Sequence, residues 1–423
     1  MIPWEAPLAS SPVAGTVKVP GSKSATARSL VLAALADGPG SIHGALSSRD
    51  TSLMRTALGV LGVTIRDDGP VLRVTPPAGF SGGGVVDCGL AGTVMRFLPP
   101  IAALLDPDTT FRGDAEAQGR PMGPLLGALA DLGARVSEPH RLPFTVGGDG
   151  VRGGPVALDA SGSSQFVSGL LLAGARFPDG IEVRHTGGEL PSLPHVAMTV
   201  RMLRARGVAV DEPAPTTWRV QPGPIAAVAD HIEPDLTNAA TLLAAAVATG
   251  GRLTTRWPEE SLQAADELAA ALAGFGASLG YHEGEAGRVL TVTGPDRLRA
   301  VDLDLHAISE FTPVAAALAC LADGVSTIRG VAHVRGHKTD RLAALERELG
   351  ALGAAVRQTA DGLEITPRPL RGATFHTWAD QRMAHAGALL GLVTPGVVLD
   401  DVGCAAKTLP DFPGLWTSLL GAA

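Results

Sequence analysis

The stretch Val19–Gly38, VPGSKSATARSLVLAALADG, decides how the rest of the sequence is interpreted. Pro20 and Gly21 end an extended segment, and either Ser22 or Ser24 is suited to cap a helix N-terminus. The helix that follows is apolar on nearly every face, which indicates burial on all sides. The stretch therefore predicts a buried helix with a polar beginning.

Two cations, Lys23 and Arg28, flank the positive end of this predicted helix. The helix dipole disfavours cations there, unless an anion lies between them. Backbone N–H groups, hydroxyls and two cations at one helix start are typical of an anion site, and phosphate is the anion that we expect. The spacing of a P-loop, G-x-x-x-x-G-K, is absent. The alternative is a surface helix with a capping serine and two solvated charges.

Composition narrows the class of partner. The chain has 423 residues, enough for two or three domains, and its 45% hydrophobic and 18% charged residues are typical of globular proteins. A net charge of −8 argues against nucleic acid or an anionic membrane as a partner. A local basic cluster in an acidic chain instead favours a small anionic substrate.

The cysteines and the first residues indicate the compartment. Cys88, Cys320 and Cys404 show no C-x-x-C spacing, so neither a disulfide framework nor a zinc site is expected. Their scarcity fits a reducing cytosol. The segment MIPWEAPLASS lacks the features of a signal peptide, and no apolar run reaches 18 residues. We therefore expect a cytoplasmic protein without a membrane span.

One pattern, a helix ending at glycine and followed by a strand hairpin, recurs five times. Glycine after a helix is the usual left-handed cap, and alternating apolar residues around a polar turn predict the hairpin. Successive glycines are 71, 74, 69 and 77 residues apart. They are Gly62, Gly133, Gly207, Gly276 and Gly353.

A second pattern, a polar helix start followed by a very apolar Ala/Leu helix and a short strand, precedes each hairpin and returns once more at the end. Its anchors are Lys23, Gly92, Ser164, Asp235, Glu310 and Asp380, at intervals of 69, 72, 71, 75 and 70 residues. These repeats predict an α/β fold of six βαβαββ-like units, the last without its hairpin. A helical solenoid is disfavoured because each unit carries strands.

The repeats divide into two lobes of three, with buried helices and sheets outside. The break is expected near HIEPD, residues 231–235, after a Pro/Gly-rich segment. Lobe one then spans 21–233 and lobe two spans 1–20 and 234–423. The first strand, TVKVP at 16–20, precedes unit one and could belong with the second lobe.

Charged and hydroxyl side chains gather at the predicted helix starts. If these starts face one cleft, their dipoles converge, and many arginines with few acids imply a substrate with several negative charges. Taken singly, Arg96 could equally bind a neighbouring carbonyl, and Ser163 could only cap its helix. The residues concerned are Lys23, Ser24, Arg28, Thr93, Arg96, Ser163, Ser164, Gln165, Asp235, Glu310, Asp380 and Arg382, with Arg120, Arg335, Arg341 and Lys407 in loops.

A series of motifs in order spans nearly the whole chain. It comprises PGSKS at 20–24, LAGTVMRF at 90–97, GRPM at 119–122, SSQFVSGLLL at 163–172, EPDLTNA at 233–239, TDRL at 339–342 and AKTLPDF at 406–412. With this series the chain resembles the enolpyruvyl transferases, and most closely the EPSP synthase family. A series of this length is far more specific than any single motif.

The resemblance implies two inside-out α/β barrel lobes that close over the substrates. It implies transfer of the enolpyruvyl group of phosphoenolpyruvate to the 5-hydroxyl of shikimate 3-phosphate, with release of phosphate, in the shikimate pathway of aromatic amino-acid biosynthesis. No metal or organic cofactor is needed, and we expect a monomer. Gly92 keeps the small residue that the family's glyphosate site requires.

The resemblance also implies roles for individual residues. Lys23, Glu310 and Lys338 are the expected catalytic residues, and Glu310 would accept the proton of the attacking hydroxyl. His195 lies at a family tyrosine position. Phosphoenolpyruvate would be held by Lys23, Gly92, Thr93, Arg120, Gln165, Arg341, Arg382 and Lys407. Shikimate 3-phosphate would be held by Lys23, Ser24, Arg28, Ser163, Ser164, Gln165, Ser192, Glu310, His333 and His337.

Several further positions depart from the family pattern, and among them His333 and His337 lie where the family usually has other polar residues. Lys338 replaces a glutamate thought to handle the methylene proton of phosphoenolpyruvate, and Gln381 replaces a histidine. Ala27 and Leu90 each replace an asparagine. A missing general acid or base typically costs about 10²–10⁴-fold in rate. In the alternative interpretation, Lys338 turns outward and another group carries the proton.

These departures leave other functions open. A UDP-N-acetylglucosamine enolpyruvyl transferase usually has a reactive cysteine in the loop that here reads GDAEAQGRPM, residues 113–122, which has none. A divergent paralogue could act on another cyclic alcohol. A ligand-binding homologue would bind either substrate with weak turnover or none.

Overall fold

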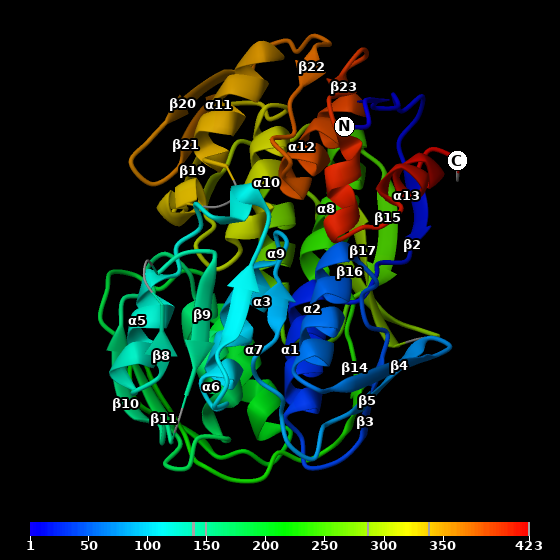
Figure 1. The fold of residues 1–423 in the computed structure, drawn as a ribbon. Coiled ribbons are helices and arrows are strands. Elements are labelled where there is room, and N and C mark those ends of the chain that lie inside the picture. Colours follow the sequence, from blue (N-terminus) through cyan, green and yellow to red (C-terminus); the bar gives the residue numbers. More distant parts are fainter. Residues whose placement is uncertain (138–139, 149, 286, 337–338, 422–423) are drawn as a thin grey trace. The chain divides into compact units, whose positions relative to one another are not determined.

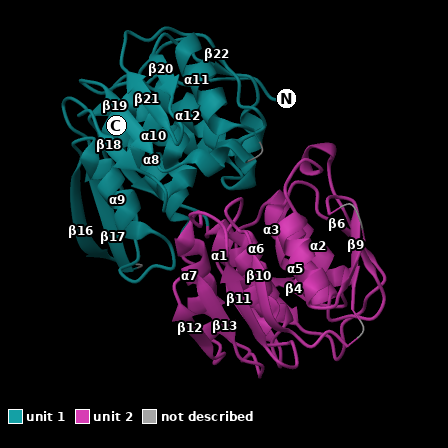
Figure 2. Ribbon diagram, turned by 90° about the vertical axis from the view of Figure 1, so that its left-hand side faces the viewer, with its two compact units in different colours: residues 1–20, 234–423 teal, residues 21–233 magenta. Residues whose placement is uncertain are grey.

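The chain forms two compact units, each with three buried helices inside and three sheets. The computed structural model describes residues 1–137, 140–148, 150–285, 287–336 and 339–421. Unit 1 contains residues 1–20 and 234–423, and unit 2 contains residues 21–233. Figure 2 shows the two units in teal and magenta.

In unit 2, the apolar helices predicted from the sequence form the interior. Every residue of α1 from Ala25 to Ala34 is buried, and α6 contacts both α1 and α3. Leu98 and two prolines, Pro99 and Pro100, divide the second expected helix into α3 and α4, because proline cannot donate the hydrogen bond that a continuous helix needs. The helices are α1 (Lys23–Ala34), α2 (Arg49–Val60), α3 (Gly92–Phe97), α4 (Pro99–Ala102), η1 (Ala115–Ala117), α5 (Gly123–Asp131), α6 (Gln165–Gly174) and α7 (Leu193–Arg204).

The three sheets of unit 2 share one four-stranded plan. The first two strands of each are parallel, and the last two pair antiparallel as the predicted hairpin. In order across each sheet, the strands are β14 (Ala229–His231), β3 (Gly40–His43), β5 (Val71–Thr75) and β4 (Thr64–Asp68); β6 (Val85–Asp87), β7 (Thr109–Arg112), β9 (Phe144–Gly147) and β8 (Arg135–Val136); and β10 (Gly154–Leu158), β11 (Ile181–His185), β13 (Thr217–Val220) and β12 (Val210–Ala214).

Unit 1 repeats the arrangement. The buried helices α8, α10 and α12 contact one another. The short turn η2 places Glu310 directly before α10. The helices are α8 (Leu236–Thr249), α9 (Ala265–Gly274), η2 (Ser309–Phe311), α10 (Thr312–Ala319), η3 (Ala332–Gly336), α11 (Arg341–Ala351), α12 (Gln381–Gly391), η4 (Val402–Lys407) and α13 (Phe412–Ser418).

The last sheet of unit 1 has three strands, since the sixth repeat lacks its hairpin, as predicted. A short strand near the N-terminus, β1, pairs antiparallel with β23 there. The sheets are β16 (Ser278–Gly284), β17 (Gly287–Thr293), β15 (Arg252–Arg256) and β2 (Ala14–Val17); β18 (Asp302–Asp304), β19 (Ser326–Arg329), β21 (Leu363–Thr366) and β20 (Ala355–Gln358); and β1 (Trp4–Glu5), β23 (Val398–Leu399) and β22 (Thr374–Phe375).

Two strands are exchanged between the units. In sequence β2 precedes α1, yet it pairs with β15 in unit 1 (Figure 1). Conversely, β14 precedes α8 but pairs with β3 in unit 2. Within unit 2, Ser22 N donates to Glu233 O at 2.8 Å, and within unit 1, Asp235 N donates to Pro20 O at 2.9 Å. In each unit, a backbone hydrogen bond therefore joins the two points at which the chain enters and leaves that unit.

The five helix-ending glycines adopt the left-handed conformation that their pattern predicts, with φ between 76° and 113°. The α/β fold class, with buried helices and outer sheets in six repeats, is confirmed. Among the described residues, no helix has the length and apolar character needed to cross a membrane.

Candidate active site

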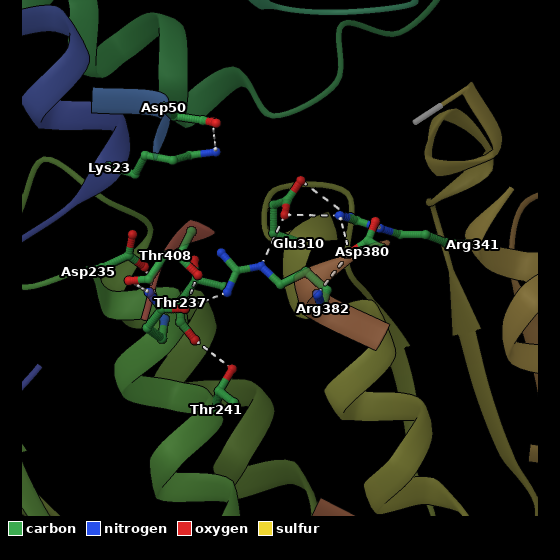
Figure 3. Close-up of polar contacts among 11 residues, drawn as sticks. Lys23, Asp50, Asp235, Thr237, Thr241, Glu310, Arg341, Asp380, Arg382 and Thr408 are labelled. Carbon is green, nitrogen blue, oxygen red and sulfur yellow. Dashed lines mark hydrogen bonds and ion pairs between the residues drawn. The ribbon is translucent and has the colours of Figure 1, made fainter. Parts of the chain in front are cut away.

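Lys23 is the first residue of α1, whose first turn contains no acidic residue. Its Nζ lies 3.7 Å from Oδ2 of Asp50, in the first turn of α2, and the Lys23 side chain is 24% exposed. Of the two possible caps, Ser22 is the one used, since its Oγ accepts from Ala25 N at 3.3 Å. The lysine ammonium is thus held at a helix start that solvent can reach (Figure 3).

Arg28, one turn further along α1, is buried among neutral acceptors. Its Nε donates to Thr199 Oγ1 at 2.7 Å, and its Nη2 donates to Ser168 Oγ at 3.1 Å and to the His195 carbonyl at 3.0 Å. Its Nη1 donates to the carbonyl of Ser24 at 3.1 Å. Burial lowers the pKa of this guanidinium to about 9. The side chain joins α1, α6 and α7 at their N-terminal halves.

The starts of α6 and α7 carry further residues that are expected to bind shikimate 3-phosphate. Ser163 Oγ accepts from Gln165 N at 3.3 Å, and the buried Ser164 stands at the N-cap position of α6. Ser192 precedes α7 in a left-handed conformation, with φ of 51°, which is strained for a residue with a side chain. A strained residue at a helix start is typical of a functional position.

Two guanidinium groups surround Gly92, the first residue of α3. A Cβ at Gly92 would lie 2.7 Å from Nη2 of Arg120 and 2.8 Å from Nη1 of Arg96, so a side chain there would displace them. Arg96 Nη1 also donates to Gln165 Oε1 at 3.2 Å. Burial, and then the charge of Arg120, hold the pKa of Arg96 well below its usual value. Gly92, Thr93 and Gln165, expected to hold phosphoenolpyruvate, thus lie at the starts of α3 and α6, with Arg120 beside them in the loop before α5. The excess positive charge there favours an anion.

Unit 1 contains a second charged cluster, centred on Glu310. The Glu310 Oε2 atom lies 3.1 Å from Nε of Arg382, and its Oε1 atom lies 3.3 Å from Nη1 of Arg341 (Figure 3). Both arginines are at most 5% exposed, whereas Glu310 is 31% exposed. Two neighbouring guanidinium groups favour the ionised form of a carboxyl group. A carboxylate that solvent reaches therefore lies between two buried cations.

Asp380 contacts both arginines. Its Oδ2 accepts from Arg341 Nε at 2.9 Å, while its Oδ1 accepts from the backbone N of Arg382 at 2.8 Å and so caps α12. Burial alone would raise the pKa of Asp380, but the Arg341 guanidinium holds it below its usual value. For Arg341, burial acts to lower the pKa, yet the charges of Asp380 and Glu310 raise it above the ordinary value.

The start of α8 supplies a neutral partner. Arg382 Nη1 donates to Asn238 Oδ1 at 2.6 Å, and Asn238 Nδ2 donates to the carbonyl of Thr408 at 3.2 Å. Asp235 caps the same helix through Asn238 N at 3.0 Å. These bonds fix the end of η4, where Lys407 is half-buried, relative to Arg382.

His333 lies on η3, half-buried, with its ring 5.6 Å from that of His306 in an edge-on arrangement. Burial, followed by the charge of His306, lowers the pKa of His333 to about 4, so this imidazole is neutral at pH 7. Two expected site residues, His337 and Lys338, lie outside the described residues.

Comparison with known proteins identifies the family. Residues 8–416 match the EPSP synthase family, described as EPSP synthase (3-phosphoshikimate 1-carboxyvinyltransferase). A curated 3-phosphoshikimate 1-carboxyvinyltransferase of Mycobacterium ulcerans (strain Agy99) is 52% identical over 426 residues, which cover 99% of this chain and 98% of that relative. The chain belongs to the EPSP synthase family. It is accordingly a transferase.

Solved structures show the same fold. An EPSP synthase of Acinetobacter baumannii, determined at 2.37 Å, matches with a TM-score of 0.81 and 23% identity over 97% of both chains. The enolpyruvyl transferase NikO of Streptomyces tendae matches with a TM-score of 0.75 and 19% identity, over 97% of this chain and 96% of that one. These EPSP synthase and enolpyruvyl transferase structures extend the likeness over nearly the whole chain.

The family motifs located the two clusters, but several residues in them were missed. Asp50 faces Lys23, and Thr199 and Ser168 bind Arg28. A capping serine before Asp50, Ser48, marks the start of α2 in the sequence, yet nothing local connects that start with α1. All of these partners come from other helices of the same unit.

Proposed function

We propose that this protein transfers the enolpyruvyl group of phosphoenolpyruvate to the 5-hydroxyl of shikimate 3-phosphate and releases phosphate. The observation that carries the proposal is the full-length similarity, at 52% identity, to a curated 3-phosphoshikimate 1-carboxyvinyltransferase. The arginines of the two clusters support it, since both substrates carry phosphate and carboxylate groups. Arg28, Arg96 and Arg341 are buried, so their cost of desolvation is already met when an anion arrives.

The reaction that we propose has an addition step and an elimination step. Glu310 accepts the proton of the 5-hydroxyl, whose oxygen attacks C2 of phosphoenolpyruvate while C3 takes up a proton. The adduct then loses the phosphate group that came from phosphoenolpyruvate, together with a proton from C3, which restores the double bond. Lys23, Arg341 and Arg382 stabilise the charge that develops on the leaving phosphate.

We assign the other expected residues as ligands. Ser24, Arg28, Ser163, Ser164, Ser192 and His333 serve shikimate 3-phosphate, Gly92, Thr93, Arg120 and Lys407 serve phosphoenolpyruvate, and Gln165 serves both. Glyphosate fits the same proposal, because Gly92 leaves the space beside Arg96 and Arg120 that a Cβ would fill.

The proposed setting is a monomer in the cytoplasm. Its support is the family, together with three free cysteines. Burial raises the pKa of both Cys88 and Cys320 to about 12, so these thiols are unreactive.

The test is phosphate release with both substrates, compared with each substrate alone. We expect release only when phosphoenolpyruvate and shikimate 3-phosphate are both present. Shikimate and UDP-N-acetylglucosamine serve as acceptor controls and should give none. Absence of release with shikimate 3-phosphate, while both substrates bind, would favour a ligand-binding homologue.

A specific observation favours one second candidate, a carboxyvinyltransferase for a different cyclic alcohol. Gln381 replaces the family histidine, and its side chain is buried with an Oε1 atom that finds no hydrogen-bond partner among the described residues. Such a group is costly unless something binds it. Release of phosphate with another cyclic alcohol, and not with shikimate 3-phosphate, would establish this candidate.

A further inference from the structure

The turn that joins β22 to α12 has a strained backbone. Trp378 and Ala379 both adopt the left-handed conformation, with φ of 56° and 53°. Residues with a side chain seldom adopt it, and two in succession persist only where their surroundings hold them. The next residue is Asp380, which caps α12 and binds Arg341. The strain is thus located directly before the Glu310 cluster.

One buried carboxylate holds this turn, which we define as His376–Ala379. Glu348 is 1% exposed and receives three contacts from the turn. Its Oε2 atom accepts from His376 N at 2.9 Å and lies 3.0 Å from His376 Nδ1. Its Oε1 atom accepts from Trp378 Nε1 at 3.1 Å. Arg347 Nε also lies 3.7 Å from Oε1, but the three shorter contacts all come from the turn, and a buried carboxylate bound in this way fixes the turn in place.

A second carboxylate holds the middle of the turn. Asp400 Oδ1 accepts from Thr377 N at 2.8 Å and from Thr377 Oγ1 at 2.9 Å. The carbonyl of Thr377 in turn accepts from Asp380 N at 2.9 Å. The position of Asp380 therefore depends on the turn through the backbone.

Helix α11 contacts this segment at two points. Arg341 and Glu348 are seven residues apart on α11, a spacing that places them on the same helix face. Arg341 binds Asp380 inside the candidate active site, while Glu348 binds the turn outside it. Any shift of the turn relative to α11 would move the start of α12, and Arg382 with it.

We propose that Glu348 is a positioning residue for the reaction. By holding the strained turn against α11, it sets the orientation in which Arg382 meets Glu310 and phosphoenolpyruvate. The proposal rests on the proposed function for the identity of the substrate. It assigns Glu348 no contact with either substrate.

The principal variant is Glu348→Gln, which preserves size but cannot accept all three contacts. We expect KM for phosphoenolpyruvate to rise about 10-fold, because Arg382 is displaced, while KM for shikimate 3-phosphate changes less than about 2-fold. Trp378→Phe removes the Nε1 donor and reduces the ring that lies 5.4 Å from Arg347 Cζ, so a rise of about 3-fold is expected, with the fold preserved.

A matched control lies on the same helix. Glu346 accepts from Gln358 Nε2 at 2.6 Å, so Glu346→Gln removes a carboxylate interaction of α11 without touching the turn. We expect it to leave both KM values unchanged. Ala379→Gly supplies a rescue, since glycine adopts the left-handed conformation without strain. In the double variant with Glu348→Gln, KM for phosphoenolpyruvate should return most of the way to the wild-type value.

Calorimetric titration with phosphoenolpyruvate separates this proposal from the proposed function. If the wild type binds phosphoenolpyruvate without turnover, the proposed function fails, yet a Kd about 10-fold higher in Glu348→Gln still supports positioning. Equal Kd values in wild type and Glu348→Gln would overturn positioning. A lower kcat, higher KM values for both substrates and a lower Tm, all without rescue by Ala379→Gly, would show that Glu348 is only structural.

Discussion

Asp380 Oδ2 accepts a hydrogen bond from Arg341 Nε at 2.9 Å, and neither side chain is more than 3% exposed. The same carboxylate caps α12. One buried ion pair therefore joins the starts of α11 and α12, and it holds the arginine that also faces Glu310.

Asp380→Asn should destabilise unit 1 without removing the cap, because asparagine also caps helices. Leaving a buried cation without its main counter-charge typically costs about 3–5 kcal/mol of unfolding free energy. Urea unfolding measures this loss of unfolding free energy. The control is Glu364→Gln in the exposed Arg357–Glu364 pair, 2.9 Å long, for which we expect less than about 1 kcal/mol. Equal losses for the two variants would contradict the assignment of the Asp380 pair as a buried anchor.

Lys23→Met should abolish phosphate release while leaving the fold intact. The lysine is partly exposed at a positive helix end, so removing its charge relieves the dipole of α1. Asp50 stays in the first turn of α2, where a carboxylate is favoured. Activity and Tm are measured together, with the exposed Lys18→Met as the control. A fall in Tm that parallels the lost activity would make Lys23 structural.

His385→Leu should stabilise the protein at pH 7. His385 is fully buried on α12, packs against Phe412, and neither ring nitrogen has a hydrogen-bond partner among the described residues. Removing an unsatisfied buried group should raise the unfolding free energy by about 1 kcal/mol. His385→Asn, which remains polar, should show no gain.

The same residue should contribute to acid sensitivity. Burial, then the charge of Arg382, hold the pKa of His385 well below 6.5, so the unfolded chain binds a proton that the folded chain does not. Wild-type stability should therefore fall as pH drops below about 6.5, and His385→Leu should show a shallower fall. His333, with its pKa lowered to about 4, accounts for part of the remaining slope. Identical pH profiles would refute the contribution of His385.

Lys338→Glu should raise kcat with shikimate 3-phosphate if the family's proton transfer applies to this chain. An ammonium of ordinary pKa is a poor proton donor at neutral pH, so the gain could reach about 10²-fold. Losing a cation should raise KM for phosphoenolpyruvate at the same time. Gln381→His is measured singly and in combination. A fast wild type that Lys338→Glu slows would mean that the lysine has been recruited to the chemistry.

Much of the fold could be predicted, because its signals are local. Apolar helices, capping residues such as Ser22 and Asp235, and helix-ending glycines such as Gly62 act over a few residues each. Repetition then strengthened each weak signal. The break at Leu98–Pro100 is also local, but the apolar run continues across it and conceals it.

The contacts inside the clusters could not be predicted in the same way. Arg28 binds Thr199, 171 residues away, and Arg382 binds Asn238, 144 residues away. Which acceptor an arginine finds depends on how the buried helices pack. The left-handed backbone at Trp378 gives no sequence signal either, because tryptophan is among the residues least suited to it.

The exchange of β2 and β14 has a consequence for the order in which the chain can fold during synthesis. Thr255 Oγ1 binds the carbonyl of Val17, 238 residues earlier, so the first strand leaves the ribosome long before its partner exists. Residues 21–233, by contrast, contain every strand of their own three sheets. Once they fold, the Ser22–Glu233 hydrogen bond brings the two ends of that segment together. The loop that still has to close between β2 and β15 then spans tens of residues instead of hundreds, which lowers the entropy cost of closing it.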